Sequence, residues 1–302
     1  MSGVDTSMTI KDALDRAKLL KQARLREERL EQAAQREAQA ASAPRAEPHS
    51  FMAEAPRPAP VRLAPLAMVD ISAAACEESR ILLTEEQRRA LPQADAAYRL
   101  LRSRVQQRLK RSNWSTLAIV SPEPNAGKTV TALNLALYIA REQQRPVYVV
   151  DLDMRNPSVC KYLGLTAVRP LPEYLTGDAA PEDVLVQTSV PGLIVAGARA
   201  TVEGASEILA GPRLENLLAH IRMRSPDALV IIDLPPVNVT DEALVVAPRV
   251  DALLVVTREG QTQRRDLERT LSTLAEYTVA GVIVNQSSDD QVTQYDTYGY
   301  AA

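Results

Sequence analysis

The stretch LAIVSPEPNAGKTVTALNLA, residues 117–136, decides the fold of this chain. It reads as a buried strand over 117–120, a tight loop over 121–127, and a helix that opens at Lys128 and Thr129. A loop that closes on Gly-Lys-Thr ahead of a helix forms a phosphate cradle, because backbone N–H groups and the positive end of the helix dipole face the anion. Lys128 is predicted to reach the β- and γ-phosphates, and the Thr129 hydroxyl to hold Mg²⁺.

One position departs from the full phosphate-loop pattern. The pattern has a glycine five residues before Gly127, and this chain has Pro122 there. Gly-Lys-Thr alone also occurs by chance on ordinary helices, so the prediction depends on further carboxylates placed at strand ends.

Composition narrows the class of protein. The 302 residues are 46% hydrophobic, enough for one or two domains with a real core, and a net charge of −3 gives no general case for nucleic-acid binding. Two cysteines, Cys76 and Cys160, favour a reducing compartment. With no signal peptide and no apolar run of about 18 residues, we expect a cytoplasmic protein whose membrane contact is peripheral or through a partner.

The segments outside the nucleotide-binding region also carry signals. Residues 1–40 predict a charged helix, either solvated or docked on an acidic partner or anionic membrane surface. Residues 41–93 read as a Pro/Ala-rich linker and adaptor. The main domain is expected over 94–285 and a flexible tail over 286–302. A helix over 94–111 opens the main domain, and its basic face is either solvated or a self-association surface.

From residue 114 onward, strands and helices alternate. Most predicted strands are continuous Val, Ile and Leu runs, which implies burial on both faces. The expected fold is α/β, a mostly parallel sheet with helices on both faces, preceded by the helical extension and Pro-rich linker. Ligands bind such a sheet at the carboxyl ends of its strands. The expected strands are 115–120, 147–151, 192–196, 228–232, 252–256 and 280–284, and the expected helices are 128–143, 205–223, 241–248 and 263–277.

Carboxylates fall at that edge of the predicted sheet. Asp151 and Asp153 end the second strand, and Asp233 follows four apolar residues. Such groups hold Mg²⁺ directly or through water, and one of them can accept the proton of an attacking hydroxyl. Arg155 either pairs with these aspartates or contacts phosphate. An isolated aspartate would read as a turn or helix cap, but three after a phosphate loop predict a nucleoside-triphosphate site.

These motifs resemble those of the bacterial tyrosine kinases of capsule and exopolysaccharide synthesis, which use a P-loop. The residues that carry the resemblance are PNAGKT (124–129), VVDLDMR (149–155) and IIDLPP (231–236), within a match over roughly 94–302. The resemblance implies ATP with Mg²⁺ as cofactors and a protein-tyrosine kinase reaction. The implied catalytic residues are Lys128, Asp151, Asp153 and Asp233, with Asp151 or Asp153 as general base, and the implied metal residues are Thr129, Asp151 and Asp233. The implied nucleotide-binding residues are Pro124, Asn125, Ala126, Gly127, Lys128, Thr129, Val130 and Arg155. Asn285 is either an adenine contact or a strand-end cap.

The family phosphorylates its own C-terminal tyrosines, and this chain ends QYDTYGYAA. Tyr295, Tyr298 and Tyr300 are therefore the predicted autophosphorylation sites, against the alternative of a polar tail with incidental tyrosines. The resemblance also implies control of polysaccharide polymerisation or export, with activation by a separate membrane co-polymerase at the inner face of the plasma membrane. Where the family often has a ring-forming glutamate the chain has Ala96, so self-association is an open expectation.

Two rival functions remain at this point. A partition- or Min-type ATPase shares the same sheet, but it has a second lysine early in the loop, where this chain has Glu123. A nucleotide-binding regulatory subunit of an export complex, without kinase activity, is the other. Leu234, where the family often has Thr or Ser, and the short tyrosine tail favour that second reading.

Overall fold

The computed structural model describes residues 63–142 and 145–287. The chain divides into two units, residues 1–61 and 62–302, and all described residues belong to the second. The predicted helix over 1–40, the first part of the linker and residues 288–302 of the tail lie outside the described residues.

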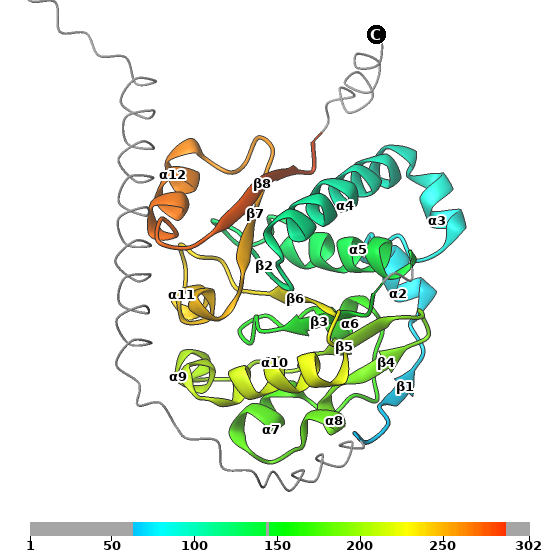
Figure 1. Cartoon of the computed structure of the whole chain (residues 1–302). Coiled ribbons are helices and arrows are strands. Elements are labelled where there is room, and N and C mark those ends of the chain that lie inside the picture. Colours follow the sequence, from blue (N-terminus) through cyan, green and yellow to red (C-terminus); the bar gives the residue numbers. More distant parts are fainter. Residues whose placement is uncertain (1–62, 143–144, 288–302) are drawn as a thin grey trace, which may run out of the picture. The chain divides into compact units, whose positions relative to one another are not determined.

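The second unit is built on one eight-stranded sheet (Figure 1). Its strand order is β1-β4-β5-β3-β6-β2-β7-β8, and all neighbouring pairs are parallel except β4 with β5. The expectation of a mostly parallel sheet is confirmed. The strands are β1 (Ala67–Val69), β2 (Thr116–Val120), β3 (Val147–Asp151), β4 (Val186–Thr188), β5 (Leu193–Ala196), β6 (Leu229–Asp233), β7 (Ala252–Arg258) and β8 (Val279–Asn285).

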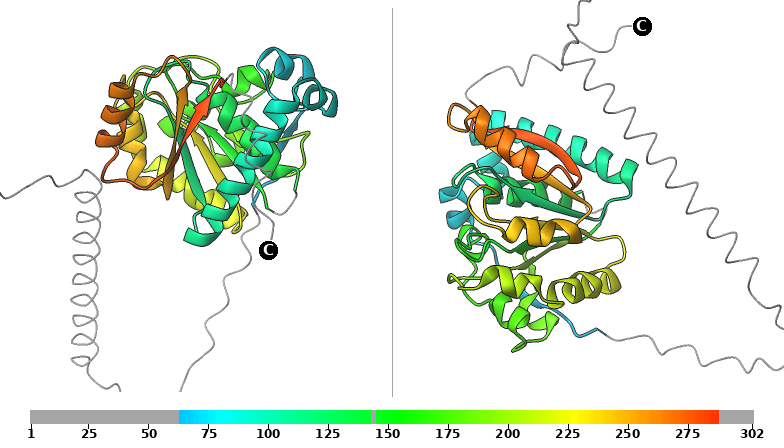
Figure 2. Two further views of the ribbon diagram at one scale, coloured as in Figure 1. Left: turned by 90° about the horizontal axis from the view of Figure 1, so that it is seen from above. Right: turned by 90° about the vertical axis from the view of Figure 1, so that its left-hand side faces the viewer.

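Helices cover both faces of the sheet, and Figure 2 shows these layers from two further directions. Alternate residues of β2 enter different cores: Leu117 and Ile119 face one cluster, and Ala118 and Val120 face the other. The first cluster packs under α2 (Ala73–Glu78), α4 (Pro92–Ser112), α5 (Lys128–Ala140) and α6 (Val159–Tyr162). The second packs under α7 (Leu171–Thr176), α8 (Pro181–Val184), α9 (Ala205–Ala210), α10 (Arg213–Arg224), α11 (Glu242–Val246) and α12 (Arg264–Thr273).

Local chemistry sets the ends of the long helix α4 that precedes β2. Pro92 occupies the first helical position, where its missing N–H is harmless. Asn113 ends the helix in the left-handed conformation, with φ of 54°. Val105 and Leu109 form its buried face, and the helix expected over 94–111 is present.

The segment before α4 belongs to the folded unit. β1 pairs with β4 at the edge of the sheet, and α3 (Glu85–Ala90) begins with a capping box formed by Thr84 and Gln87. Buried Asn134 of α5 accepts from the Leu82 N–H at 2.8 Å, and Arg141 donates to the Leu82 carbonyl at 2.7 Å. These bonds fasten the adaptor to the helix that follows the phosphate loop.

The structure corrects several expected boundaries. One helix over 205–223 is wrong: Gly211 and Pro212 separate α9 from α10, because Pro212 lacks the N–H that a continuous helix needs. The strands β1 and β4 were not predicted, since each has three residues and no run long enough to show a period.

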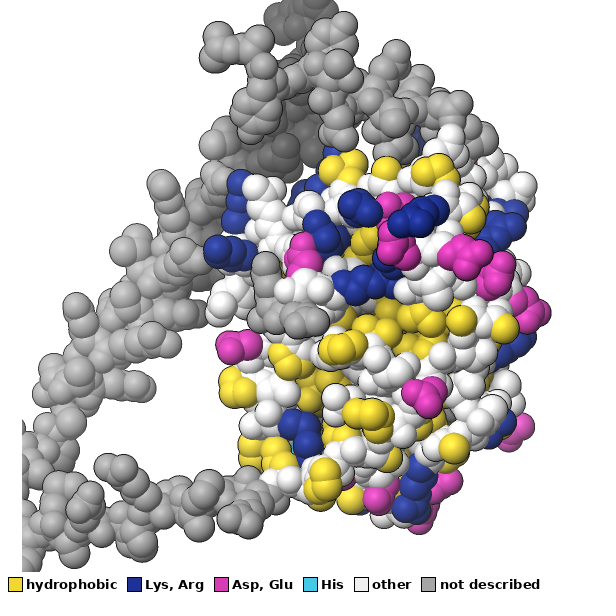
Figure 3. All heavy atoms as spheres, turned by 90° about the vertical axis from the view of Figure 1, so that its right-hand side faces the viewer, with side chains coloured by type: hydrophobic (Ala, Val, Ile, Leu, Met, Phe, Trp, Pro, Cys, Tyr) yellow, Lys and Arg dark blue, Asp and Glu magenta, His cyan; other side chains and the backbone are white. Residues whose placement is uncertain are grey.

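One face of the molecule is rich in basic side chains near α3 and α4. Figure 3 shows Lys and Arg gathered in its upper part, with hydrophobic side chains below them. Arg88 and Arg89 end α3, and Arg99 of α4 pairs with Asp95 of the same helix at 2.9 Å.

Among the described helices, none combines the length and the apolar character that crossing a membrane requires.

Candidate active site

The phosphate loop joins β2 to α5 at the carboxyl edge of the sheet. Gly127 is the N-cap of α5 and has φ of 91°, a conformation that favours glycine. A Cβ at this position would lie 2.0 Å from Nδ2 of Asn285. The helix begins immediately after the loop and has 13 residues. Its first backbone N–H groups have no partner within the helix and can bind an anion.

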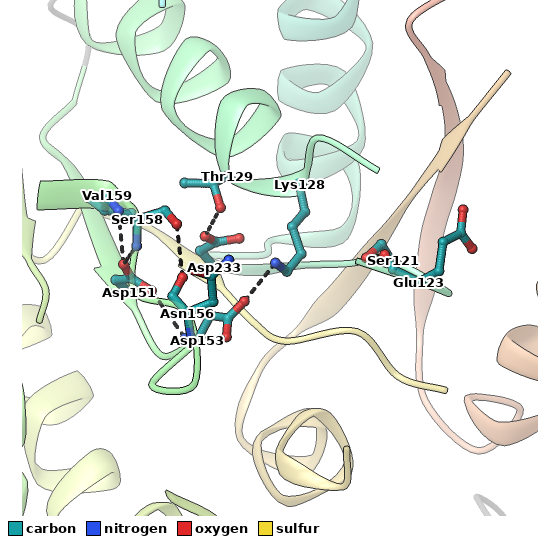
Figure 4. Close-up of polar contacts among 10 residues, drawn as sticks. All are labelled: Ser121, Glu123, Lys128, Thr129, Asp151, Asp153, Asn156, Ser158, Val159 and Asp233. Carbon is teal, nitrogen blue, oxygen red and sulfur yellow. Dashed lines mark hydrogen bonds and ion pairs between the residues drawn. The ribbon is translucent and has the colours of Figure 1, made fainter. Parts of the chain in front are cut away.

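Lys128 lies inside the site rather than on the surface. Its Nζ donates to Oδ2 of Asp153 at 2.7 Å, and both side chains are buried. Burial lowers the pKa of Lys128, but the carboxylates of Asp233 and Asp153 outweigh it and raise the pKa above the ordinary value. The charged form is therefore favoured, and Figure 4 shows the ammonium held at Asp153.

Thr129 and Asp233 form the second contact between α5 and the sheet. The Thr129 hydroxyl donates to Oδ2 of Asp233 at 2.5 Å. Burial raises the pKa of Asp233 to about 6, although Lys128 pulls it down. The other oxygen, Oδ1, is buried and has no hydrogen-bond partner among the described residues. An orphaned buried carboxylate oxygen is costly and marks a place where a ligand is expected.

Asp151 lies beside Asp233, its register partner across the β3–β6 pair. Its Oδ1 accepts from the Asp153 N–H at 3.1 Å, and its Oδ2 accepts from the N–H groups of Ser158 and Val159 at 2.9 and 3.0 Å. Burial and Asp233 nevertheless raise the pKa of Asp151 well above its ordinary value. Asp151 thus fixes the loop that carries Asp153 (Figure 4).

The loop tolerates Pro122 because neighbouring segments hold its first half. The Ser121 carbonyl accepts from the Val237 N–H at 2.9 Å, and the Pro122 carbonyl from the Asn238 N–H at 3.3 Å. The Glu123 carboxylate accepts the hydroxyl of Thr262, in the connection between β7 and α12. The donors lie in the segments that follow β6 and β7, the two strands on either side of β2. These bonds hold the loop in place with a proline where the motif has a glycine.

Asn285 lies at the end of β8, against the same loop. Its Nδ2 donates to the Ala126 carbonyl at 3.0 Å, and its own carbonyl accepts from the Glu259 N–H at 3.0 Å. The side chain therefore fastens the phosphate loop to the last strand of the sheet.

Arg155 contacts a residue that the sequence analysis missed. Its Nε donates to Oε1 of Glu242 at 2.6 Å; the Glu242 side chain is 1% exposed, and that of Arg155 is 60% exposed. Glu242 opens α11, 87 residues further along the chain. A lone glutamate in the sequence TDEALVV carries no pattern that distinguishes it from a helix-start acid.

The residues present fit a magnesium–nucleotide complex. Thr129 supplies a hydroxyl, and Asp233 supplies a buried oxygen with no other partner. Mg²⁺ is usually bound by one or two carboxylates together with waters and substrate phosphates. No set of three or more His, Cys, Asp or Glu side chains within 63–142 and 145–287 is placed to hold a metal by itself.

The predicted site residues therefore divide into three groups. The structure brings together Lys128, Asp151, Asp153, Asp233 and the segment from Pro124 to Val130, with Asn285 beside the loop. Arg155 forms its ion pair with Glu242 and not with the aspartates, as one expectation had it. Tyr295, Tyr298 and Tyr300 lie outside the described residues.

Comparison with known proteins agrees with this geometry. The ParA family model, described as NUBPL iron-transfer P-loop NTPase, matches residues 114–294. The chain is similar to "Tyrosine-protein kinase ptk" of Acinetobacter johnsonii, with 32% identity over 187 residues, 62% of this chain. The chain spans only 25% of that relative's length.

Two further comparisons cover nearly whole relatives. "Tyrosine-protein kinase CpsD" of Streptococcus agalactiae is 24% identical over 224 residues, which are 73% of this chain and 95% of the relative. The solved structure "BceF Tyrosine Kinase Domain" has a TM-score of 0.59 and 25% identity, and the match covers 73% of this chain and 92% of that one.

Proposed function

We propose that this chain, a member of the ParA family of P-loop NTPases, is an ATP-dependent protein-tyrosine autokinase of the bacterial tyrosine kinase type. Its proposed biological role is control of capsule or exopolysaccharide polymerisation and export. The observation that carries the proposal is the buried cluster in which Lys128 and Thr129 meet Asp153 and Asp233 at one sheet edge. The names of the related proteins supply the tyrosine acceptor.

The proposed roles follow from what each side chain touches. The loop from Pro124 to Val130 binds the phosphates through its backbone, and Lys128 stabilises the charge that develops on the transferred group. Thr129 and Asp233 would hold Mg²⁺, which would neutralise phosphate charge when bound. Asp151 would contribute through water, because its oxygens already accept backbone N–H groups. Arg155, at the exposed rim of the site, would contact the phosphates, and Asn285 would contact the adenine.

For the general base we favour Asp153 over Asp151. Both oxygens of Asp151 are held by rigid backbone donors. Oδ2 of Asp153 is held by the Lys128 side chain, for which nucleotide phosphates compete. The acceptors are Tyr295, Tyr298 and Tyr300 of the tail, and the domain over 94–285 carries the chemistry.

The proposed setting is the cytoplasmic face of the plasma membrane. A separate membrane co-polymerase is the proposed activator, and the predicted helix over 1–40 is a candidate contact for it. A pull-down in which deletion of residues 1–45 changes nothing would remove that helix from the proposal.

The deciding experiment incubates the full chain with Mg²⁺ and labelled ATP and maps the phosphorylated residues. Label on tail tyrosines is expected in the wild type and is expected to vanish in Lys128→Met and in a Tyr295/Tyr298/Tyr300→Phe triple variant. Label that persists in the triple variant, or that falls only on other residue types, contradicts the proposal. If ATP binds without label, the assay is repeated with the cytoplasmic tail of the membrane partner, and continued absence of label favours a nucleotide-sensing regulator.

The ParA family match gives a basis for the alternative, a partition- or Min-type ATPase without kinase activity. Against it stands Glu123, whose carboxylate is bound within the chain to Thr262 and lies where such a protein needs a lysine. Dimerisation caused by ATP alone, in the absence of tyrosine phosphorylation, would favour that alternative.

A further inference from the structure

An ion pair between a buried glutamate and a partly exposed arginine connects the loop after β3 to the start of α11. Arg155 lies two residues past Asp153, in the loop after β3, and Glu242 begins α11, after the loop that follows β6. Their contact, Arg155 Nε to Glu242 Oε1, measures 2.6 Å. The two loops also carry the carboxylates that face each other across the β3–β6 pair, Asp151 and Asp233.

The two partners of this pair differ in burial, and so in the cost of removing their charge from water. The Glu242 side chain is 1% exposed, its Oε2 has no hydrogen-bond partner among the described residues, and its one ion-pair partner is Arg155. Removing a carboxylate from water is costly, and one partly exposed guanidinium compensates only part of that cost. A glutamine of the same shape would remove the cost, so packing alone does not explain a glutamate at this position.

The position of the pair explains the glutamate better. Loop residues 151–159 are already fixed at one side by the backbone bonds to Asp151. Arg155 fixes the other side of the loop, beyond Asp153, to α11. Asp241, the residue before Glu242, accepts the hydroxyl of Ser206 in α9, so α11 is itself anchored to a neighbouring helix.

We propose that Glu242 is a positioning residue for phosphoryl transfer: its buried carboxylate holds Arg155, and with it the loop that carries Asp153, in register with Asp233 and the phosphate loop. Glu242 acts through Arg155 and does not touch the substrate. This inference rests on the proposed phosphotransferase function of the same site. It predicts that activity and stability respond in opposite directions when the carboxylate is neutralised.

The test compares Glu242→Gln, Arg155→Ala and the double variant in the full chain. Arg155→Ala leaves a buried carboxylate without its partner and is expected to lower Tm by about 4 °C or more. Glu242→Gln is expected to keep or raise Tm, and the double variant to recover the Tm that Arg155→Ala loses. All three are expected to lose about tenfold in kcat for autophosphorylation, while KM for ATP in Glu242→Gln stays within about twofold.

A matched control is Glu215→Gln. Glu215 of α10 also pairs with an arginine, Arg249, at 3.1 Å, but its side chain is 63% exposed. This variant is expected to change neither Tm nor kcat.

The result that overturns the inference is a Glu242→Gln enzyme with kcat within twofold of wild type. A loss of kcat that merely follows a loss of Tm overturns it as well, since a purely structural residue behaves in that way. If the wild type transfers no phosphate to tyrosine, the proposed kinase function fails separately. The same variant ratios are then measured on Mg²⁺-dependent ATP hydrolysis, where an equal kcat in Glu242→Gln rejects the positioning role and a tenfold loss supports it.

Discussion

A carboxylate lies at each end of strand β2, and the two differ in how many hydrogen bonds they accept. At the amino end, Asp251 accepts from the N–H groups of Ser115 and Thr116 at 2.7 and 2.8 Å and from both of their hydroxyls. At the carboxyl end, Asp233 is fully buried, accepts from Thr129 and keeps one oxygen without a partner. Burial raises the pKa of both groups, but at Asp251 the N–H and hydroxyl donors reverse this and lower it.

The difference indicates that Asp251 stabilises the fold, whereas Asp233 lies in an arrangement that leaves a buried oxygen for a ligand. Donors arranged around a charged carboxylate stabilise the folded state at the amino end. At the carboxyl end burial disfavours the charged form of Asp233, as is typical of carboxylates that bind a ligand or take up a proton. Mutations at the two ends of β2 are therefore expected to have different effects, one on activity and the other on stability.

The largest effect is expected from Asp233→Asn. The variant loses a carboxylate that we place at the metal, so transfer to tyrosine is expected to fall about a hundredfold or more. Because an amide is cheaper to bury than a carboxylate, the free energy of unfolding is expected to stay the same or rise. Phosphorylation rates and urea denaturation of the same preparation measure both; a variant that is destabilised yet active contradicts the comparison.

Asp251→Ala is expected to have the reverse effect. It leaves the N–H groups of Ser115 and Thr116 without their acceptor, which costs about 2 kcal/mol of unfolding free energy. The kcat at a temperature well below Tm is expected to change less than twofold. Glu276→Ala, which removes an exposed carboxylate, is the control and is expected to leave both quantities unchanged.

Gly127→Ala tests how closely the carboxyl end is packed. The positive φ of 91° costs an alanine about 1–2 kcal/mol, and its Cβ would collide with Asn285. ATP affinity is expected to fall together with stability. Adding Asn285→Ala relieves the collision but not the backbone strain, so calorimetry of the double variant is expected to show partial recovery; full recovery would mean that strain contributes nothing.

The smallest effect concerns pH. The folded-state pKa of Asp251 is depressed, so its contribution to stability is present above the unfolded value of about 3.9 and is lost as pH falls through the folded value. The stability difference between wild type and Asp251→Ala is therefore expected to be constant from pH 7 to about 5 and to shrink below about pH 4. Urea titrations across this range measure it, and a difference that grows on acidification would reverse the sign.

The strands and the helix that surround the site could be predicted from the sequence, because local residue patterns identify them. Continuous apolar runs ending in Asp151 and Asp233 identify buried parallel strands, and a helix after Gly127 identifies the phosphate loop. In a parallel sheet these ends must meet at one edge, so the chain order alone placed Lys128 near the aspartates.

Contacts between distant segments gave no such pattern. The pairing of Arg155 with Glu242, of Glu123 with Thr262 and of Asn285 with Ala126 spans 87, 139 and 159 residues. Each depends on which neighbours the sheet order brings together, and β6 and β7 flank β2 although they come much later in the chain.

The sequence by itself therefore predicted the long central strands and their parallel arrangement and pointed to candidate residues for a phosphate site, because periodicity and strand-end chemistry are properties of contiguous residues. Only the tertiary structure decided which carboxylate is satisfied, which is orphaned and which holds an arginine. Burial and hydrogen-bond partners are set by packing between segments far apart in the chain. An aspartate is therefore fully hydrogen-bonded at one end of β2, as Asp251, and keeps a buried oxygen without a partner at the other, as Asp233.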